Sequence, residues 1–124
     1  MRRATLLLPL LAFAGCADRP KLVEVSGKVT HNGKAVTGGS VWFHPAEGNA
    51  YQGEKPSGQL QLDGTFTARS FPHGDGIPPG KYRVTLSPDL AARMGKPKLG
   101  NADKTPWSAE IPEGGLKDLA FEVK

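Results

Sequence analysis

Glycine and proline interrupt this chain so often that a fold built from long helices is excluded. There are 16 glycines and 11 prolines among 124 residues, and the segments between them are short. From Val23 onward, Val23, Val25 and Val29 share one face of an extended chain, with polar residues between them, and Asn32-Gly33 follows. Alternation with a period of two predicts a half-buried β-strand, and Asn-Gly predicts a tight turn after it. The sequence therefore favours an all-β fold.

The clearest hairpin in the sequence surrounds Asp63-Gly64. Two alternating runs, 59–62 and 65–69, flank this dipeptide, which tolerates the positive φ angles of a tight turn. Apolar side chains at every second position predict a hairpin with one buried side. That side is expected to carry Leu60, Leu62, Phe66 and Ala68.

The rest of the chain repeats this pattern of short strands and turns. Strands are predicted over 40–44, 81–86, 107–111 and 119–123. A short helix is predicted to begin at Ser87 and to end at Gly95, whereas the segments 46–57, 71–80 and 96–106 are expected to be irregular. About seven short strands at intervals of roughly ten residues predict an antiparallel β-sandwich.

The N-terminal segment has the pattern of an export signal. Arg2 and Arg3 precede the apolar run 4–14, which contains Pro9 and is too short to cross a bilayer as a helix. Residues 13–16, Phe-Ala-Gly-Cys, resemble the bacterial lipoprotein box, in which the cysteine is acylated after cleavage. We therefore predict a lipoprotein signal peptide over 1–15, a short tether over 16–22 that begins at lipidated Cys16, and one small domain over 23–124.

The cysteine count and the charge agree with this interpretation. A single cysteine cannot form an internal disulfide or a four-cysteine metal site, whereas Cys16 stands where lipid is attached. Removal of residues 1–15 would lower the formal net charge from +4 to +2, with 14 basic against 12 acidic residues. The remainder has no basic run with interleaved aromatic residues, so we expect no nucleic-acid partner. We expect an exported, lipid-anchored protein of the bacterial envelope, and Ala17 after the cysteine favours the outer membrane.

Three segments carry a resemblance to a known family. Residues 25–46 (VSGKVTHNGKAVTGGSVWFHPA), 63–66 (DGTF) and 79–84 (PGKYRV) resemble the carboxypeptidase regulatory-like, or transthyretin-like, domain as it occurs in small bacterial lipoproteins. The resemblance covers most of residues 23–123. It implies a seven-stranded, prealbumin-like Greek-key sandwich that is usually non-catalytic and serves stability, adhesion, or carbohydrate and protein contact.

Few residues in the sequence offer metal or catalytic chemistry. The candidate metal ligands are scattered without the spacing of a metal motif, so no metal or other cofactor is expected; they are His31, His44, His73, Asp63 and Asp75.

A Ser-His-Asp set can be assembled only from Ser57 or Ser70 with His73 and Asp75, without a nucleophile-elbow motif. The hydroxyisourate hydrolases, which share the transthyretin-like fold, are recognised by a terminal Tyr-Arg-Gly-Ser, whereas this chain ends in Phe-Glu-Val-Lys. The sequence therefore predicts a protein that is not an enzyme.

The two tryptophans are the remaining candidates for a binding surface. Trp42 is out of phase with Val41 and Phe43, and we expect a loop or the second sheet to bury it, with exposure as the alternative. Trp107 follows Thr105-Pro106 and is equally suited to the core or to a ligand surface. The sequence favours a structural or interaction module that contacts an envelope protein or polysaccharide. The alternative is a metal- or carbohydrate-binding lipoprotein that uses loop histidines and an exposed tryptophan.

Overall fold

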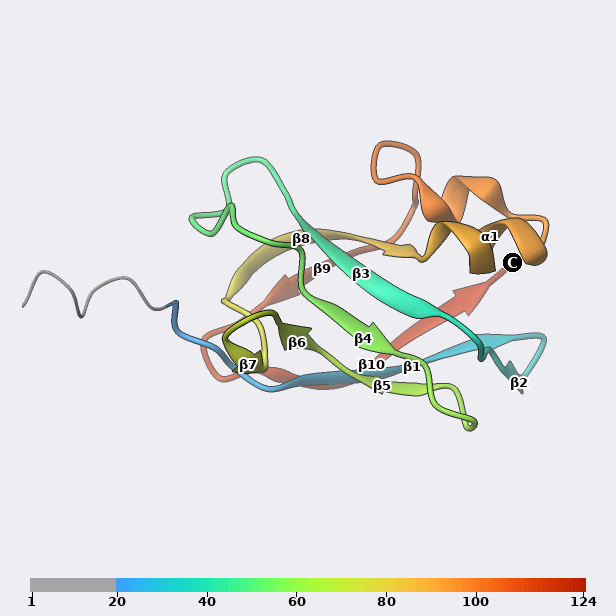
Figure 1. Cartoon of the computed structure of the whole chain (residues 1–124), viewed down its shortest axis with the longest axis horizontal. Helices are drawn as coiled ribbons and strands as arrows, with labels where there is room; N and C mark the ends of the chain where they lie inside the picture. Colours follow the sequence, from blue (N-terminus) through green and yellow to red (C-terminus); the bar gives the residue numbers. More distant parts are fainter. Residues whose placement is uncertain (1–19) are drawn as a thin grey trace, which may run out of the picture.

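Two β-sheets face each other in the computed structural model, which describes residues 20–124 (Figure 1). The predicted signal peptide and Cys16 lie outside the described residues. Ten short strands, one helix and one 3₁₀ turn make up the described part: β1 (Val25–His31), β2 (Lys34–Ala35), β3 (Ser40–Pro45), β4 (Ser57–Gln59), β5 (Thr65–Thr67), β6 (Arg69–Ser70), β7 (Gly74–Asp75), β8 (Gly80–Leu86), α1 (Pro88–Arg93), η2 (Pro97–Gly100), β9 (Ser108–Ile111) and β10 (Leu116–Val123).

The two sheets confirm the predicted all-β sandwich. In the first sheet β1 is central, with β10 on one side and both β2 and β5 on the other. The second sheet has the order β7-β6-β4-β3-β8-β9, and all of its pairs are antiparallel. One pair departs from the antiparallel prediction, because β1 and β10 run parallel with Val29 opposite Phe121. A parallel pair needs a long crossover, and here nearly the whole domain forms it.

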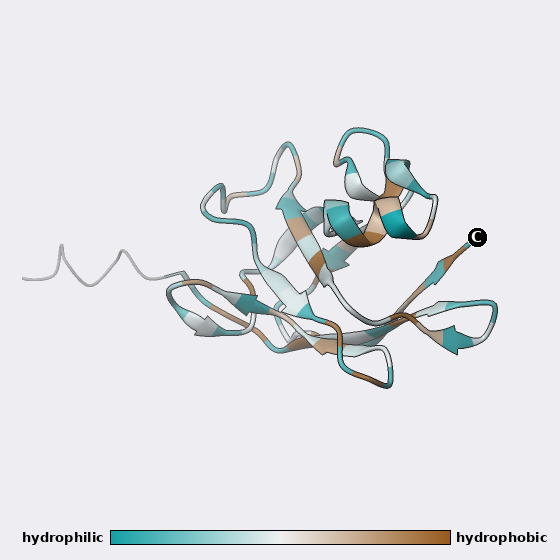
Figure 2. Cartoon of the chain, turned by 45° about the vertical axis from the view of Figure 1, so that its right-hand side comes forward, coloured by the Kyte–Doolittle hydropathy of each residue, from teal (hydrophilic) through white to brown (hydrophobic). Residues whose placement is uncertain are grey.

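Side chains from both sheets fill the space between them. Phe43 of β3 lies with its ring centre 6.1 Å from that of Phe66 and 6.0 Å from that of Tyr82, the latter edge to face. The Tyr82 hydroxyl donates a hydrogen bond of 2.6 Å to the carbonyl of Pro78, and burial raises the pKa of Tyr82 to about 12. Apolar and polar residues alternate along the strands in Figure 2, as the sequence predicts. The described residues thus bury a core of their own and can fold without the preceding segment.

The predicted strand and turn at the start of the domain are confirmed. Val25 and Val29 are fully buried on the inner face of β1, whereas Lys28 is exposed on the outer face. Asn32 and Gly33 have φ angles of 54° and 80°, the conformation required of a two-residue turn between twisted antiparallel strands. The turn places β2 beside the end of β1, with Lys34 opposite His31.

The hairpin predicted around Asp63-Gly64 is wrong as a continuous ladder. The turn itself forms, with Gly64 at φ 82° and the Asp63 carboxylate accepting from the Thr65 amide at 3.1 Å. Its arms, however, enter different sheets, because β4 pairs with β3 while β5 pairs with β1. The chain changes sheet between the arms, so the alternation breaks at Leu62, which is 92% exposed instead of buried.

The helix begins and ends as predicted, although Ser87 acts differently. Ser87 precedes α1 and Pro88 opens it, but the Ser87 hydroxyl makes no capping bond and instead accepts from the Ser40 amide at 3.2 Å. Gly95 has φ 70° and follows the helix directly after Met94. The segment 96–106, predicted as irregular, contains η2, and the irregular segment 71–80 contains the two-residue β7. Within residues 20–124, α1 and η2 are both far shorter than a bilayer-spanning helix.

Leucines 60 and 62 provide a matched test of this architecture. Leu60→Ala removes a side chain that is 6% exposed and should lower the free energy of unfolding by about 2–4 kcal/mol. Leu62→Ala changes a solvated side chain and should stay within about 0.5 kcal/mol of the unaltered domain. Urea unfolding of both variants measures the difference. Equal destabilisation would mean that both leucines lie in the core, as a continuous hairpin requires.

Candidate functional site

A pocket of about 510 Å³ opens between η2, the residues 106–107 that precede β9, and the C-terminal end of β10. Its lining combines apolar side chains with four charged ones: Gly95, Lys96, Pro97, Lys98, Leu99, Pro106, Trp107, Glu122 and Lys124. The neighbouring α1 and the C-terminal end of β10 lie at one end of the long axis, and the described chain begins at the other (Figure 1). The residues that line the pocket therefore belong to the end of the domain that is far from its start.

Hydrogen bonds to β8 fix the position of Trp107. The buried Thr105 hydroxyl accepts from the Trp107 amide at 3.1 Å and donates to the Val84 carbonyl at 2.7 Å. The Val84 amide in turn donates to the Trp107 carbonyl at 3.0 Å. On β10, the Phe121 ring stacks on the indole of Trp107, with ring centres 4.9 Å apart and an angle of 28° between the planes. One indole face is thus covered, while the half-buried side chain also lines the pocket.

The opposite wall of the pocket is held by α1. The Lys96 amide donates to the Ala91 carbonyl at 2.9 Å, and the Leu99 amide donates to the Lys96 carbonyl at 2.9 Å. Leu99 is 6% exposed and belongs to the core, so it ties η2 to the sandwich. Pro97 and Pro106 restrict the backbone on either side of the pocket. The pocket is therefore formed by anchored backbone, as small-molecule sites usually are.

Sequence reasoning identified Trp107 but missed its partners in the pocket. The segment 96–106 was expected to be a polar loop, whereas it supplies Lys96, Pro97, Lys98 and Leu99 to the lining. Leu99 is the one large apolar residue of that segment, and this was the available signal that the segment packs against the core. The approach of β10 to η2 has no counterpart in the sequence pattern.

Trp42 lies on the outer face of the second sheet, and the expected burial is only partly correct. Its side chain is half-buried, with the Lys55 ammonium 5.4 Å from the ring centre. Its ring centre lies 6.3 Å from that of His44 on the same strand. Lys55 comes from the loop after β3, so a loop side chain covers part of this tryptophan.

His44 is held on the same outer face by the neighbouring strand. Its Nε2 lies 2.9 Å from the hydroxyl of Thr85 on β8. Burial lowers the pKa of His44, and the positive charge of Lys55 lowers it further, whereas Asp103 partly opposes them. Thr85 is fully buried, so its hydroxyl is closed to a substrate and the pair serves structure.

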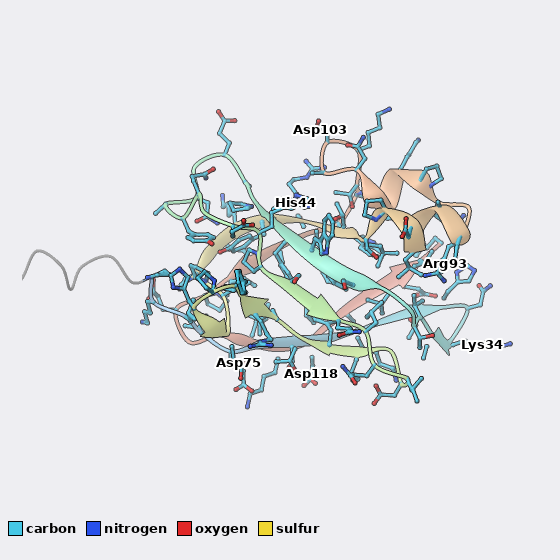
Figure 3. The ribbon with its side chains drawn as sticks, in the orientation of Figure 1. Lys34, His44, Asp75, Arg93, Asp103 and Asp118 are labelled. Carbon is cyan, nitrogen blue, oxygen red and sulfur yellow. The ribbon has the colours of Figure 1, made fainter. Side chains whose placement is uncertain are left out.

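The other metal and catalytic candidates are not brought together. His31 on β1 has its Nδ1 3.0 Å from the Val123 carbonyl, and His73 lies in the exposed turn between β6 and β7. The Asp75 carboxylate pairs with Arg69 at 3.0 Å, and His44 and Asp75 lie well apart in Figure 3, on strands β3 and β7 that β4 and β6 separate in the second sheet. Among residues 20–124 there is no group of three or more metal-ligating side chains.

The serines of the possible Ser-His-Asp set, and the metal candidate Asp63, also lie in local structure of their own. The Ser70 hydroxyl is buried and donates to the Gly76 carbonyl at 2.8 Å. Ser57 pairs with Arg69 through the β4–β6 ladder. Asp63 accepts two bonds from Thr65, at 2.6 Å from the hydroxyl and 3.1 Å from the amide, and these bonds lower the pKa of Asp63. The Ser70 and Asp63 side chains thus have local structural partners, and Ser57 is a ladder residue of β4.

A second hollow, of about 710 Å³, lies over the outer face of β1, β5 and β10. Its lining is largely polar and carries both signs of charge, with Lys28, Arg69 and Asp118. A lining of mixed polarity and charge favours no one class of ligand as clearly as the mostly apolar Trp107 pocket does, so the Trp107 pocket is the stronger candidate site.

The fold and the pocket define an all-β sandwich with one ligand-sized, mostly apolar recess at its distal end. Comparisons of the chain with protein-family models, with curated proteins and with solved structures find no match.

The lowered pKa of His44 predicts a pH dependence of stability. The unfolded chain binds a proton at His44 more readily than the folded chain does, so protons favour unfolding in this range. Above the unfolded pKa of about 6.5, His44 should not lower the free energy of unfolding. Below that pH, the free energy of unfolding should fall as the pH drops through the pKa that His44 has in the folded chain.

Urea unfolding between about pH 7.5 and pH 5 measures this slope. His44→Gln should flatten it, because glutamine does not titrate. His73→Gln is the matched control, since His73 is exposed in a turn and should leave the slope unchanged. An unaltered slope in His44→Gln would show that the lost stability comes from other groups.

Proposed function

We propose that this chain is a lipid-anchored lipoprotein of the bacterial cell envelope whose β-sandwich is a non-catalytic interaction module. The observation that carries the interaction role is the preformed apolar pocket at Trp107, whose lining contains none of the possible Ser-His-Asp residues Ser57, Ser70, His73 and Asp75. A recess of this size and lining suits binding.

The anchoring part of the proposal is supported by the N-terminal sequence. Arg2 and Arg3, the apolar run 4–14 and the small residues before Cys16 follow the order of a lipoprotein signal. Diacylglycerol on the Cys16 sulfur together with an acyl chain on its amino group would exceed the two lipid signals that stable anchoring requires. The described domain begins only a few residues later, so the tether would be short.

The sandwich is compatible with the carboxypeptidase regulatory-like resemblance, which supports a non-catalytic role by analogy of fold. The Asn32-Gly33 and Asp63-Gly64 turns that carry the resemblance both adopt positive φ angles. Under this proposal the domain offers the Trp107 pocket to an envelope partner.

The alternative function is a metal- or carbohydrate-binding lipoprotein. The pocket favours the carbohydrate-binding version, in which Trp107 takes part, because an indole that lines a recess can stack on a ligand ring. The metal-binding version has less support, since His31, His44 and His73 lie on separate segments of the chain. His31 contacts the Val123 carbonyl, and His44 contacts the Thr85 hydroxyl.

Acylation at Cys16 can be tested directly because it is the only cysteine in the sequence. The full chain, expressed in a bacterial host that is fed labelled palmitate, should carry label and fractionate with the membranes. Cys16→Ser should abolish the label and leave the precursor unprocessed or release the protein from the membrane fraction.

Ala17→Ser is the matched control, since it changes the neighbouring residue and keeps the thiol. It should retain the label. Persistent labelling of Cys16→Ser, or an unlabelled parent chain, would contradict lipid attachment at this residue.

A further inference from the structure

We propose that the Trp107 pocket binds a small anionic amphiphile, with an apolar chain or ring inside the recess and a carboxylate at the lysines of its edge. This inference rests on the proposed interaction role and names its site and ligand chemistry. It concerns the folded domain alone, so it stands apart from acylation of Cys16.

The shape and lining of the recess account for the apolar part of the ligand. Its volume of about 510 Å³ lies within the roughly 300–1,000 Å³ typical of small-molecule sites. Trp107, Leu99 and the two prolines supply apolar surface, and Phe121 stacks behind the indole and holds its plane. An apolar chain or ring in contact with these groups would lose contact with water, which favours binding.

The charges at the pocket account for the anionic part. Lys96, Lys98 and Lys124 contribute three positive charges against the single negative charge of Glu122. Within residues 20–124 none of these three lysines forms a salt bridge, whereas Lys21 and Lys117 do. Unpaired ammonium groups beside an apolar surface attract an anion and disfavour a cation.

The anchored walls of the pocket favour binding of a small ligand. Backbone hydrogen bonds hold Trp107 to β8 and Lys96 to α1, so little ordering remains to oppose association. The polar side chains of the lining are all charged apart from the indole N–H, so the lining suits an anion with an apolar part better than it suits a neutral saccharide.

The two tryptophans make a direct test possible. In the domain 20–124, Trp42→Phe leaves Trp107 as the single fluorescent tryptophan. Decanoate should change the Trp107 emission in a saturable manner, and decylammonium, with the same chain and opposite charge, should bind at least about tenfold more weakly. The preference should shrink between about 20 mM and about 0.5 M NaCl because salt screens the lysines.

Two pairs of variants locate the site. In the Trp42→Phe background, the double variant Lys96→Gln, Lys98→Gln should lose most of the preference for decanoate. The matched double variant Lys34→Gln, Lys81→Gln, whose lysines lie outside the pocket lining, should keep it. The reciprocal variant Trp107→Phe leaves Trp42 as reporter, and its emission should not change when decanoate is added.

Several outcomes would overturn the proposal. These are an unsaturable response of Trp107, equal binding of decanoate and decylammonium, or binding of glucuronate, an acidic sugar, as tight as that of decanoate. Labelling of Cys16 is measured on the full chain, so failure of decanoate binding and failure of lipid attachment are separate results.

Discussion

The parallel pairing of β1 with β10 is the contact on which the rest of the structure depends. It joins the first strand of the domain to the last and so closes the first sheet around the core. The close approach requires glycine at position 27, where a Cβ atom would collide with the Leu119 carbonyl and lie 2.8 Å from the Phe66 ring. Because β10 also carries Phe121, whose ring stacks on Trp107, the same pairing helps to position the indole that lines the pocket.

Different parts of the fold hold the side chains that line the pocket. Trp107 is fixed through Thr105 and β8, whereas Leu99 is fixed through η2 and α1. The lysines come from η2 and from the end of β10, segments that are distant in the sequence. In such a site the sandwich positions the connecting segments, and side chains of those segments supply most of the contacts with a ligand, as in many β-domains.

Local reasoning succeeded where the burial of a residue follows from its own strand and failed where the chain changes sheet. The alternation in β1, β3 and β8 correctly identified inner residues such as Val25, Phe43 and Tyr82. It failed at Leu62, because the alternation was extended through a turn whose two arms belong to different sheets. It likewise identified Trp107 as a candidate without its partners, since those partners are contributed by nonlocal packing.

The sequence by itself determined the class of fold, the positions of the Asn32-Gly33 and Asp63-Gly64 turns, and the inner face of each long strand. These features depend on φ preferences and on a side-chain period of two, which are local properties. Only the tertiary structure decided that β10 pairs in parallel with β1 and that η2 approaches it to enclose a pocket. Those outcomes depend on which surfaces exclude water together, and that is settled by the packing of the whole chain.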